Sequence, residues 1–202
     1  MKLYYSPGAC SLSPHIVLLE TGTPVTLVKV DLATKTLADG SDYRTVNPDG
    51  YVPVLELDDG SRLTEGPAIV QYIADAAGAQ ALAPANGTMA RYRLQSMLNY
   101  ISTELHKGFS PLFNPRMPEE AKALARERLA ERIGSIEARL ATSDHLMGEA
   151  FTVADAYLFT VLSWSRMVGV SLTPFSRVRA YIDRIRRRPA VVAAMKAEGL
   201  VK

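Results

Sequence analysis

The sequence predicts an α/β N-terminal domain with a mixed four-stranded sheet, followed by an all-α C-terminal domain. Three observations predict this fold class. Over residues 1–78, short apolar or β-branched runs alternate with helical stretches, in the order β-α-β and then β-β-α. Strand signals stop there, and residues 88–202 show helical patterns only. Residues 79–87 carry proline and glycine and separate the two domains as a linker.

The expected elements of the first domain are short, and turn residues separate them. A strand–helix–strand start implies a right-handed crossover and a parallel strand pair. A later hairpin adds antiparallel strands, which makes the sheet mixed. No clear pattern covers the stretch between the second and third strands. In chain order we expect a strand at Lys2–Tyr5, a helix at Ser11–Thr21, strands at Val25–Val30, at Pro53–Leu57 and near Arg62–Leu63, and a helix capped by Thr64 that runs to Ala77.

The second domain is expected to contain helices alone. An apolar helix that opens with a capping box is usually part of a core. The box here is Thr152-Val153-Ala154-Asp155, and Trp164 lies on the helix that follows it. We expect helices at Thr88–Lys107, ending before Gly108 and Pro111, from Pro118 with an inner face that includes Leu140, from Thr152 to Val168, at Ser176–Arg187 and at Pro189–Ala197.

Length and composition exclude several classes of protein. The chain has 202 residues and one cysteine. A single cysteine rules out an internal disulfide framework and a multi-cysteine zinc site, and we expect no metal. No apolar run approaches the roughly 18 residues that span a bilayer, and the amino terminus lacks the apolar segment of a signal peptide. We therefore expect a cytoplasmic protein with no membrane partner.

The charge distribution differs between the two halves. Residues 1–78 are acidic overall and residues 79–202 are basic overall. The densest basic run is Arg184-Ile185-Arg186-Arg187-Arg188. Arginines in the last turn of a helix complement its dipole. This explains the run without a nucleic acid, and we expect no nucleic-acid partner.

Cys10 is the first candidate for chemistry. It lies between the first expected strand and the first expected helix, after the turn residues Ser6-Pro7-Gly8. The amino terminus of a helix presents backbone amides and partial positive charge, which stabilise a thiolate and lower a cysteine pKa from its usual ~8.5. The alternative is a buried cysteine that packs as a small apolar group. Position alone does not decide between the two.

Three further features of the first half have both a functional and a structural interpretation. A cis peptide bond before Pro53 would turn the backbone of Val52 outward to pair with a peptide-like ligand, although cis is rare at about 5–6% of such bonds. Glu65 and Gly66 open a helix whose amides can hold a carboxylate, or Glu65 simply complements the helix dipole. Lys35 is most simply a solvated lysine.

In the second half, Asn99, Thr103 and His106 fall at i, i+4 and i+7 of one expected helix, and so share a face. They lie beside an apolar stripe and could line a cleft. The alternative is an ordinary solvent-exposed face. A histidine close to a cysteine can activate its thiol, but sequence alone does not bring His106 to Cys10.

The chain as a whole resembles the bacterial beta-class glutathione S-transferases, on motifs whose order and spacing are specific together. The resemblance implies a thioredoxin-like first domain, an all-helical second domain, a homodimer and a cis bond before Pro53. The motifs are Lys2–Ser11, Asn47-Pro48, Tyr51-Val52-Pro53, Glu65–Ile69, Leu98-Asn99-Tyr100, Glu104–Lys107, Pro111-Leu112-Phe113 and Thr152–Asp155.

The resemblance also implies a site for glutathione. Cys10 and His106 would lie beside the glutathione sulfur as the catalytic residues. Val52 would pair its backbone with the cysteinyl part, and Glu65 with the Gly66 amide would hold the γ-glutamyl end. The remaining implied glutathione contacts are Ser11, Lys35, Pro53, Asn99, Thr103, Glu104 and Lys107, some of them from a partner subunit. Many relatives carry serine where this chain has Gly66, and the missing hydroxyl could weaken binding by about 0.5–1.5 kcal/mol.

The implied function is transfer of the glutathione thiol to small, mostly apolar electrophiles, which includes dehalogenation and a role in detoxification. Two alternatives stay open on the sequence. A reactive Cys10 could support glutathione-dependent thiol–disulfide exchange. The same fold could also serve a non-catalytic binding protein, since fold does not determine function.

Overall fold

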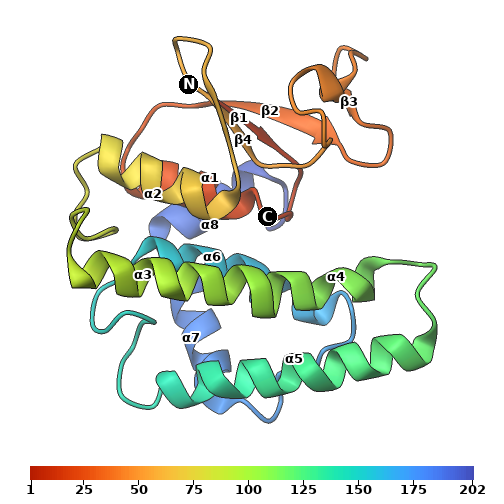
Figure 1. The fold of residues 1–202 in the computed structure, drawn as a ribbon, viewed down its shortest axis with the longest axis vertical. Helices are drawn as coiled ribbons and strands as arrows, with labels where there is room; N and C mark the ends of the chain where they lie inside the picture. The colour runs from red at the N-terminus through yellow and green to blue at the C-terminus, as the bar shows by residue number, and fades with distance from the viewer. The chain divides into compact units, whose positions relative to one another are not determined.

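Five strands form a mixed sheet in the first unit of the computed structural model, which describes residues 1–202 (Figure 1). The strand order is β3-β2-β1-β4-β5. The parallel pair β1–β2 confirms the expected crossover, and the other three pairs are antiparallel. The strands are β1 (Lys2–Tyr5), β2 (Thr26–Asp31), β3 (Thr36–Leu37), β4 (Val54–Glu56) and β5 (Arg62–Thr64).

The prediction of a four-stranded sheet was wrong by one strand. The additional strand is β3, which pairs with the end of β2 and lies in the stretch that carried no clear pattern. Two residues are too few to show an alternating pattern, so the strand depends on the turn before it. In that turn the Asp31 carboxylate accepts hydrogen bonds from the amides of Ala33 and Thr34. Lys35 then adopts a left-handed conformation with φ of 60°.

Three helices belong to the same unit as the sheet: α1 (Leu12–Glu20), α2 (Gly66–Ala76) and α8 (Pro189–Ala197). The expected cap of α2 was wrong by one residue, since Glu65 and not Thr64 occupies the N-cap position. Thr64 cannot serve because it is the last residue of β5, where it pairs with Val54.

The carboxyl-terminal residues group with the sheet, although the sequence pattern predicts them to be part of the helical domain. The two compact units are Met1–Ala79 with Arg188–Lys202, and Gln80–Arg187. Polar bonds join the terminal segment to α1. Arg188 donates to both carboxylate oxygens of Glu20, at 2.8 and 3.0 Å. Glu198 contacts the Nδ1 atom of buried His15 at 2.9 Å.

The second unit contains only helices. They are α3 (Met89–Tyr100), a π-helical turn (Ile101–His106), α4 (Lys107–Phe113), α5 (Glu119–Arg139), α6 (Val153–Ser163), a 3₁₀ turn (Trp164–Arg166) and α7 (Ser176–Arg186). None of the chain's helices is both long and apolar enough to cross a membrane.

The expected end of the first long helix was wrong. The helix continues without a break through the π-helical turn and α4 to Phe113, passing Gly108 and Pro111. Gly108 serves packing here, since a Cβ atom at this position would lie 2.8 Å from the Leu129 side chain on α5. Close contact between α4 and α5 therefore overrides the local stop signals.

The core of the second unit confirms the expected capping box. Asp155 accepts hydrogen bonds from the Thr152 amide at 2.8 Å and the Thr152 hydroxyl at 2.9 Å. The same buried carboxylate accepts from the Leu146 amide and the Tyr181 hydroxyl. Trp164 is buried as expected, but in the 3₁₀ turn that follows α6.

Candidate functional site

The loop that carries Cys10 is held by its own polar groups. It joins β1 to α1, and Cys10 is partly exposed just before the helix. The Ser11 hydroxyl accepts from the Ser6 amide and donates to the Ser6 carbonyl, both at 3.2 Å. Ser11 is fully buried. Its side chain therefore stabilises the Cys10 loop.

Cys10 and Val52 lie together in the structure. The Cys10 Sγ atom donates to the Val52 carbonyl at 3.1 Å, across 42 residues of sequence. The Val52–Pro53 peptide bond is cis. This confirms the expectation from the resemblance, although few peptide bonds before proline are cis. Val52 and Pro53 are both buried. The loop before β4 thus places its backbone beside the thiol.

Lys35 approaches the same loop from the turn before β3. It is only partly exposed, and its Nζ atom donates to the Gly50 carbonyl at 2.9 Å. The ammonium also lies 5.5 Å from the centre of the Tyr51 ring, within the range of a cation–π contact. The interpretation of Lys35 as a merely solvated lysine was therefore wrong.

Two residues beside this loop were not among the predicted site residues. Tyr43 and Asn47 both donate to the Tyr51 carbonyl, each at 2.8 Å. Asn47 belonged to a motif of the resemblance, but its bond could not be inferred from that. Tyr43 gave no signal, because it lies in the stretch without a clear pattern.

Glu65 and Gly66 form the start of α2. Glu65 is exposed, has a φ of 66° and makes no side-chain hydrogen bond to the helix terminus. Its carboxylate is therefore not used to cap α2. The Gly66 amide lies at the amino end of the helix, where backbone donors favour a carboxylate. A Cβ atom on Gly66 would meet no atom within 4 Å, so a small side chain such as serine would fit at this position.

In the second unit, Asn99, Thr103 and His106 do not form the single polar face that was expected. The expected spacing assumes a regular α-helix, but residues 101–106 form a π-helical turn with wider hydrogen-bond spacing. Asn99 and Thr103 are exposed, and the Thr103 hydroxyl donates to the Asn99 carbonyl at 3.0 Å. His106 is instead half-buried against aromatic side chains.

The surroundings of His106 determine its charge. Its Nδ1 atom lies 2.6 Å from the buried Tyr157 hydroxyl, and its ring packs edge-on against Trp164 with centroids 4.9 Å apart. Burial, and to a lesser extent the charge of Lys107, lowers the pKa of His106 from 6.5 to about 4. The ring is therefore neutral at neutral pH. Where Tyr157 donates to Nδ1, the ring proton lies on Nε2.

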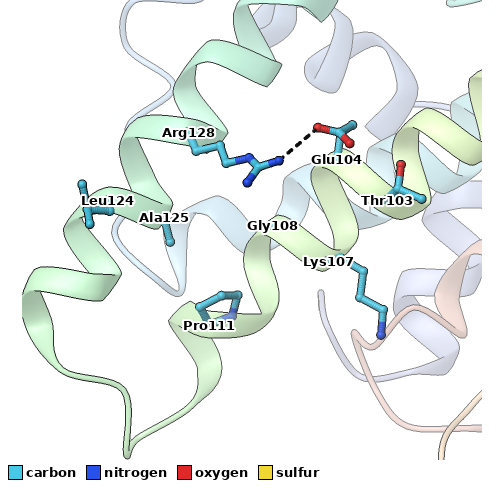
Figure 2. Close-up of a pocket in the computed structure, with 8 residues that line it drawn as sticks. All are labelled: Thr103, Glu104, Lys107, Gly108, Pro111, Leu124, Ala125 and Arg128. Atoms are coloured by element: carbon cyan, nitrogen blue, oxygen red, sulfur yellow. Dashed lines mark ion pairs between the residues drawn. The ribbon is translucent and has the colours of Figure 1, made fainter.

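Glu104 and Lys107 line a cavity of about 390 Å³ on the second unit (Figure 2). Arg128 points across the cavity toward Glu104, with the charged atoms 3.9 Å apart. Glu104 is paired more closely with Arg132, at 2.8 Å. The cavity is lined by Thr103, Glu104, Lys107, Gly108, Pro111, Leu124, Ala125 and Arg128.

The predicted site residues therefore form one set in each unit. Cys10, Lys35 and Val52 gather around one loop of the first unit, with Ser11 behind Cys10 and Pro53 after Val52. Glu65 and Gly66 begin α2 of that unit, and the remaining five lie along one continuous helix of the second unit: Asn99, Thr103, Glu104, His106 and Lys107. No group of three or more His, Cys, Asp or Glu side chains is arranged to hold a metal ion.

Comparison with known proteins gives matches to both halves of the chain. The family model of the glutathione S-transferase N-terminal domain matches residues 8–76, and that of the C-terminal domain matches residues 100–189. The chain is 50% identical over 201 residues to glutathione S-transferase GstA of Escherichia coli O157:H7, across 99% of this chain and 100% of that protein.

Two solved structures agree with this assignment over their full lengths. A sphingomonad glutathione S-transferase complexed with glutathione is 51% identical, with a TM-score of 0.95 and 100% of both chains covered. A bacterial beta-class enzyme from Sphingomonas chungbukensis is 50% identical, with a TM-score of 0.96 and the same coverage. The chain therefore belongs to the glutathione S-transferase family and, within it, to the bacterial beta class.

Proposed function

We propose that this glutathione transferase binds glutathione along the first unit, with the cysteinyl part at Val52. The observation that supports the proposal most directly is the 3.1 Å contact between the Cys10 Sγ atom and the Val52 carbonyl. An extended peptide-like ligand that pairs with the Val52 backbone would bring its own sulfur close to this thiol. The sphingomonad relative was solved with glutathione bound, which supports the same ligand here.

Groups suited to the two ends of glutathione belong to the same unit as Val52. The Gly66 amide, at the amino end of α2, suits the γ-glutamyl carboxylate. The Glu65 carboxylate, which makes no hydrogen bond to the helix terminus, suits the γ-glutamyl ammonium group. Lys35, whose ammonium already lies at the Gly50 carbonyl, suits the glycyl carboxylate. Lys35 and Glu65, which have positive φ values of 60° and 66°, thus both take part in the proposed contacts to the ends of the ligand.

The proposed reaction is attack of the glutathione sulfur on an electrophilic carbon. The thiol first loses its proton to solvent or to a nearby base. The thiolate electron pair then forms the new carbon–sulfur bond, and a leaving group such as a halide departs with its electron pair. A helix amino terminus beside the sulfur favours the anion. We propose that Cys10 stabilises this sulfur, and that His106 acts as a neutral hydrogen-bonding group.

The proposed electrophiles are small and mostly apolar. In the second unit, Phe113 and Met167 are exposed, and Phe113 packs edge-on against Trp164 with ring centroids 5.7 Å apart. Exposed apolar side chains of this kind suit an apolar second substrate. A role in detoxification and a location in the cytoplasm belong to the same proposal.

We also propose a homodimer, in which Asn99, Thr103, Glu104 and Lys107 approach the glutathione of a partner subunit. Exposed Met89 and Tyr92 on α3 would be apolar surface covered by the second copy. Light scattering during gel filtration tests this directly. Twice the chain mass is expected, and the mass of a single chain would contradict it.

A second candidate activity is glutathione-dependent thiol–disulfide exchange. It is favoured by the partly exposed Cys10 thiol at the loop where the glutathione cysteine is proposed to lie. The Cys10 thiolate would attack glutathione disulfide, form a mixed disulfide and release one glutathione thiolate. Intact-mass analysis after incubation with glutathione disulfide would show the adduct on wild type and none on Cys10→Ala.

The decisive test of the proposed site combines binding and rate measurements. Titration calorimetry with glutathione is run on wild type and on Glu65→Gln and Lys35→Met variants, together with conjugation to a halogenated nitroarene. We expect Kd to rise about 10-fold or more for each variant, because each loses a charge-assisted bond of about 1.5–3 kcal/mol. Equal Kd values for all three proteins would overturn the proposed placement of glutathione.

A further inference from the structure

Three successive carbonyls of the loop before β4 each accept a hydrogen bond from a side chain elsewhere in the first unit. The Gly50 carbonyl accepts from Lys35 and the Val52 carbonyl accepts from Cys10. The Tyr51 carbonyl between them accepts from two donors, the Tyr43 hydroxyl and the Asn47 side-chain amide, each at 2.8 Å. We call residues 50–52 the clamped loop.

The two donors to the Tyr51 carbonyl are themselves rigidly held. Tyr43 is fully buried, and its ring lies 5.7 Å from that of Tyr4. Asn47 is 7% exposed, and its side-chain oxygen accepts from the Asp49 amide. Burial raises the pKa of the Tyr43 hydroxyl well above its ordinary value, so the group keeps its proton and remains a donor at every working pH.

Fixing this carbonyl also fixes a backbone donor of the site. The carbonyl of Tyr51 and the N–H of Val52 belong to one planar peptide unit. With both acceptor positions of the oxygen occupied, rotation of the unit breaks two buried hydrogen bonds at once. The direction of the Val52 N–H is therefore set by Tyr43 and Asn47, although neither side chain contacts that N–H.

We infer that Tyr43 and Asn47 are positioning residues for glutathione, which hold the Val52 N–H toward the cysteinyl carbonyl of the ligand. This inference rests on the proposed function, because it assumes that the Val52 backbone is the pairing surface. Neither residue touches the reacting sulfur. Their loss therefore weakens binding of glutathione and leaves the chemical step of the bound complex unchanged.

Tyr43 lies in a buried apolar cluster with Tyr4, Val30, Val52 and Val54. The composition of this cluster supports a specific role for the Tyr43 hydroxyl. A phenylalanine ring would fill the same apolar volume beside Tyr4 without a polar group to satisfy. The hydroxyl instead reaches the clamped loop. Tyr4 provides a matched comparison, since it lies in the same cluster but its hydroxyl bonds to Glu56 at 3.3 Å. The two tyrosines thus differ in the acceptors of their hydroxyl hydrogen bonds: the Tyr51 carbonyl for Tyr43 and the Glu56 carboxylate for Tyr4.

The test compares Tyr43→Phe with Tyr4→Phe in the full-length protein. Each variant removes one hydroxyl from the same cluster, and only the first removes a donor to the clamped loop. We expect Tyr43→Phe to raise the glutathione Kd and KM about 3- to 10-fold, while kcat at saturating glutathione stays within about twofold of wild type. Tyr4→Phe should leave the KM within about twofold.

A second variant and a second measurement keep the test independent of activity and of folding yield. Asn47→Asp retains the acceptor for the Asp49 amide and removes the donor to Tyr51, so it should raise the glutathione KM at least as much as Tyr43→Phe. Protection of the Val52 amide from hydrogen exchange by bound glutathione should be weaker in both of these variants and unchanged in Tyr4→Phe.

The outcomes separate the inference from the proposed function. If wild type binds glutathione and the Tyr43→Phe and Tyr4→Phe variants show equal KM values, the positioning role is wrong while the proposed site stands. If kcat falls with KM unchanged, the inference is also wrong. If wild type itself binds no glutathione, the proposed function fails and this inference falls with it.

Discussion

His106 illustrates how a residue's surroundings decide what it can do. On sequence alone it was one of three polar groups on a helix face, and the resemblance implied that its imidazole lies beside the glutathione sulfur. In the structure it packs against Trp164 and Tyr157, and burial lowers its pKa to about 4. The side chain is therefore suited to hydrogen bonding as a neutral ring.

The lowered pKa of His106 predicts a specific dependence of stability on pH. Between the unfolded value of 6.5 and the folded value of about 4, the unfolded chain binds a proton that the folded protein does not. This group thus contributes a loss of stability as the pH falls through that window, by up to about 3 kcal/mol. A His106→Gln variant should lose less stability than wild type between pH 7 and 4.5 in urea unfolding.

Direct observation of the ring is the control for this prediction. Two-dimensional NMR of the three histidines should show one, assigned to His106 by its absence from the Gln variant, that titrates near pH 4. A midpoint near 6.5 for that signal would contradict the account of its burial.

Gly66 is the residue at the start of α2 where a substitution tests the proposed γ-glutamyl contact most simply. Space around its α-carbon is open, and its φ lies outside the left-handed region, so Gly66→Ser should be accommodated without strain. A hydroxyl at the start of α2 adds a donor for the γ-glutamyl carboxylate. We expect the glutathione Kd to fall about 2- to 10-fold in calorimetry, which corresponds to one ordinary hydrogen bond. Gly66→Ala, which adds no donor, should not tighten binding, and a gain with alanine would refute this explanation.

At the scale of elements, α8 supports the loop that carries Cys10. Glu198, just past the end of α8, accepts from the Gly8 amide at 2.8 Å and contacts His15 on α1 at 2.9 Å. Its side chain is fully buried. Leu200 packs on Gly8, where a Cβ atom would come within 3.3 Å of it. The end of the chain is thus part of the structure around the thiol.

Removal of the Glu198 carboxylate should therefore be costly. Glu198→Ala leaves the Gly8 amide and His15 without this buried partner, and the free energy of unfolding should fall by about 3–5 kcal/mol. Lys196→Gln, an exposed change on the same helix, is the control and should stay within about 0.5 kcal/mol. Equal unfolding midpoints for wild type and Glu198→Ala would show that the segment does not stabilise the unit.

Elements defined by local signals were the ones that the sequence predicted well. The capping box at Thr152–Asp155 and the parallel start of the sheet are short-range patterns, and both were confirmed. The continuation of the helix past Gly108 was missed because the close packing of Gly108 on Leu129 overrides a local stop signal. The strand β3 was missed because it has two residues, which are too few to show the alternation of apolar and polar side chains that marks a strand.

At the scale of the whole molecule, the resemblance to the family supplied what local patterns could not. The cis bond before Pro53 contradicts its base rate, and the contact between Cys10 and Val52 spans 42 residues. No periodicity predicts either feature. The hydrogen bonds from Tyr43 and Asn47 to the Tyr51 carbonyl were not predicted for the same reason, because they depend on the folded conformation of the loop.

The central claim is that glutathione binds with its cysteinyl part on the backbone of Val52 and its sulfur beside Cys10. The most direct measurement is a crystal structure of the protein soaked with glutathione. The claim predicts hydrogen bonds between the ligand's cysteinyl backbone and Val52, with the ligand sulfur in contact with the Cys10 Sγ atom. Glutathione bound away from the clamped loop, with Val52 unengaged, would contradict it.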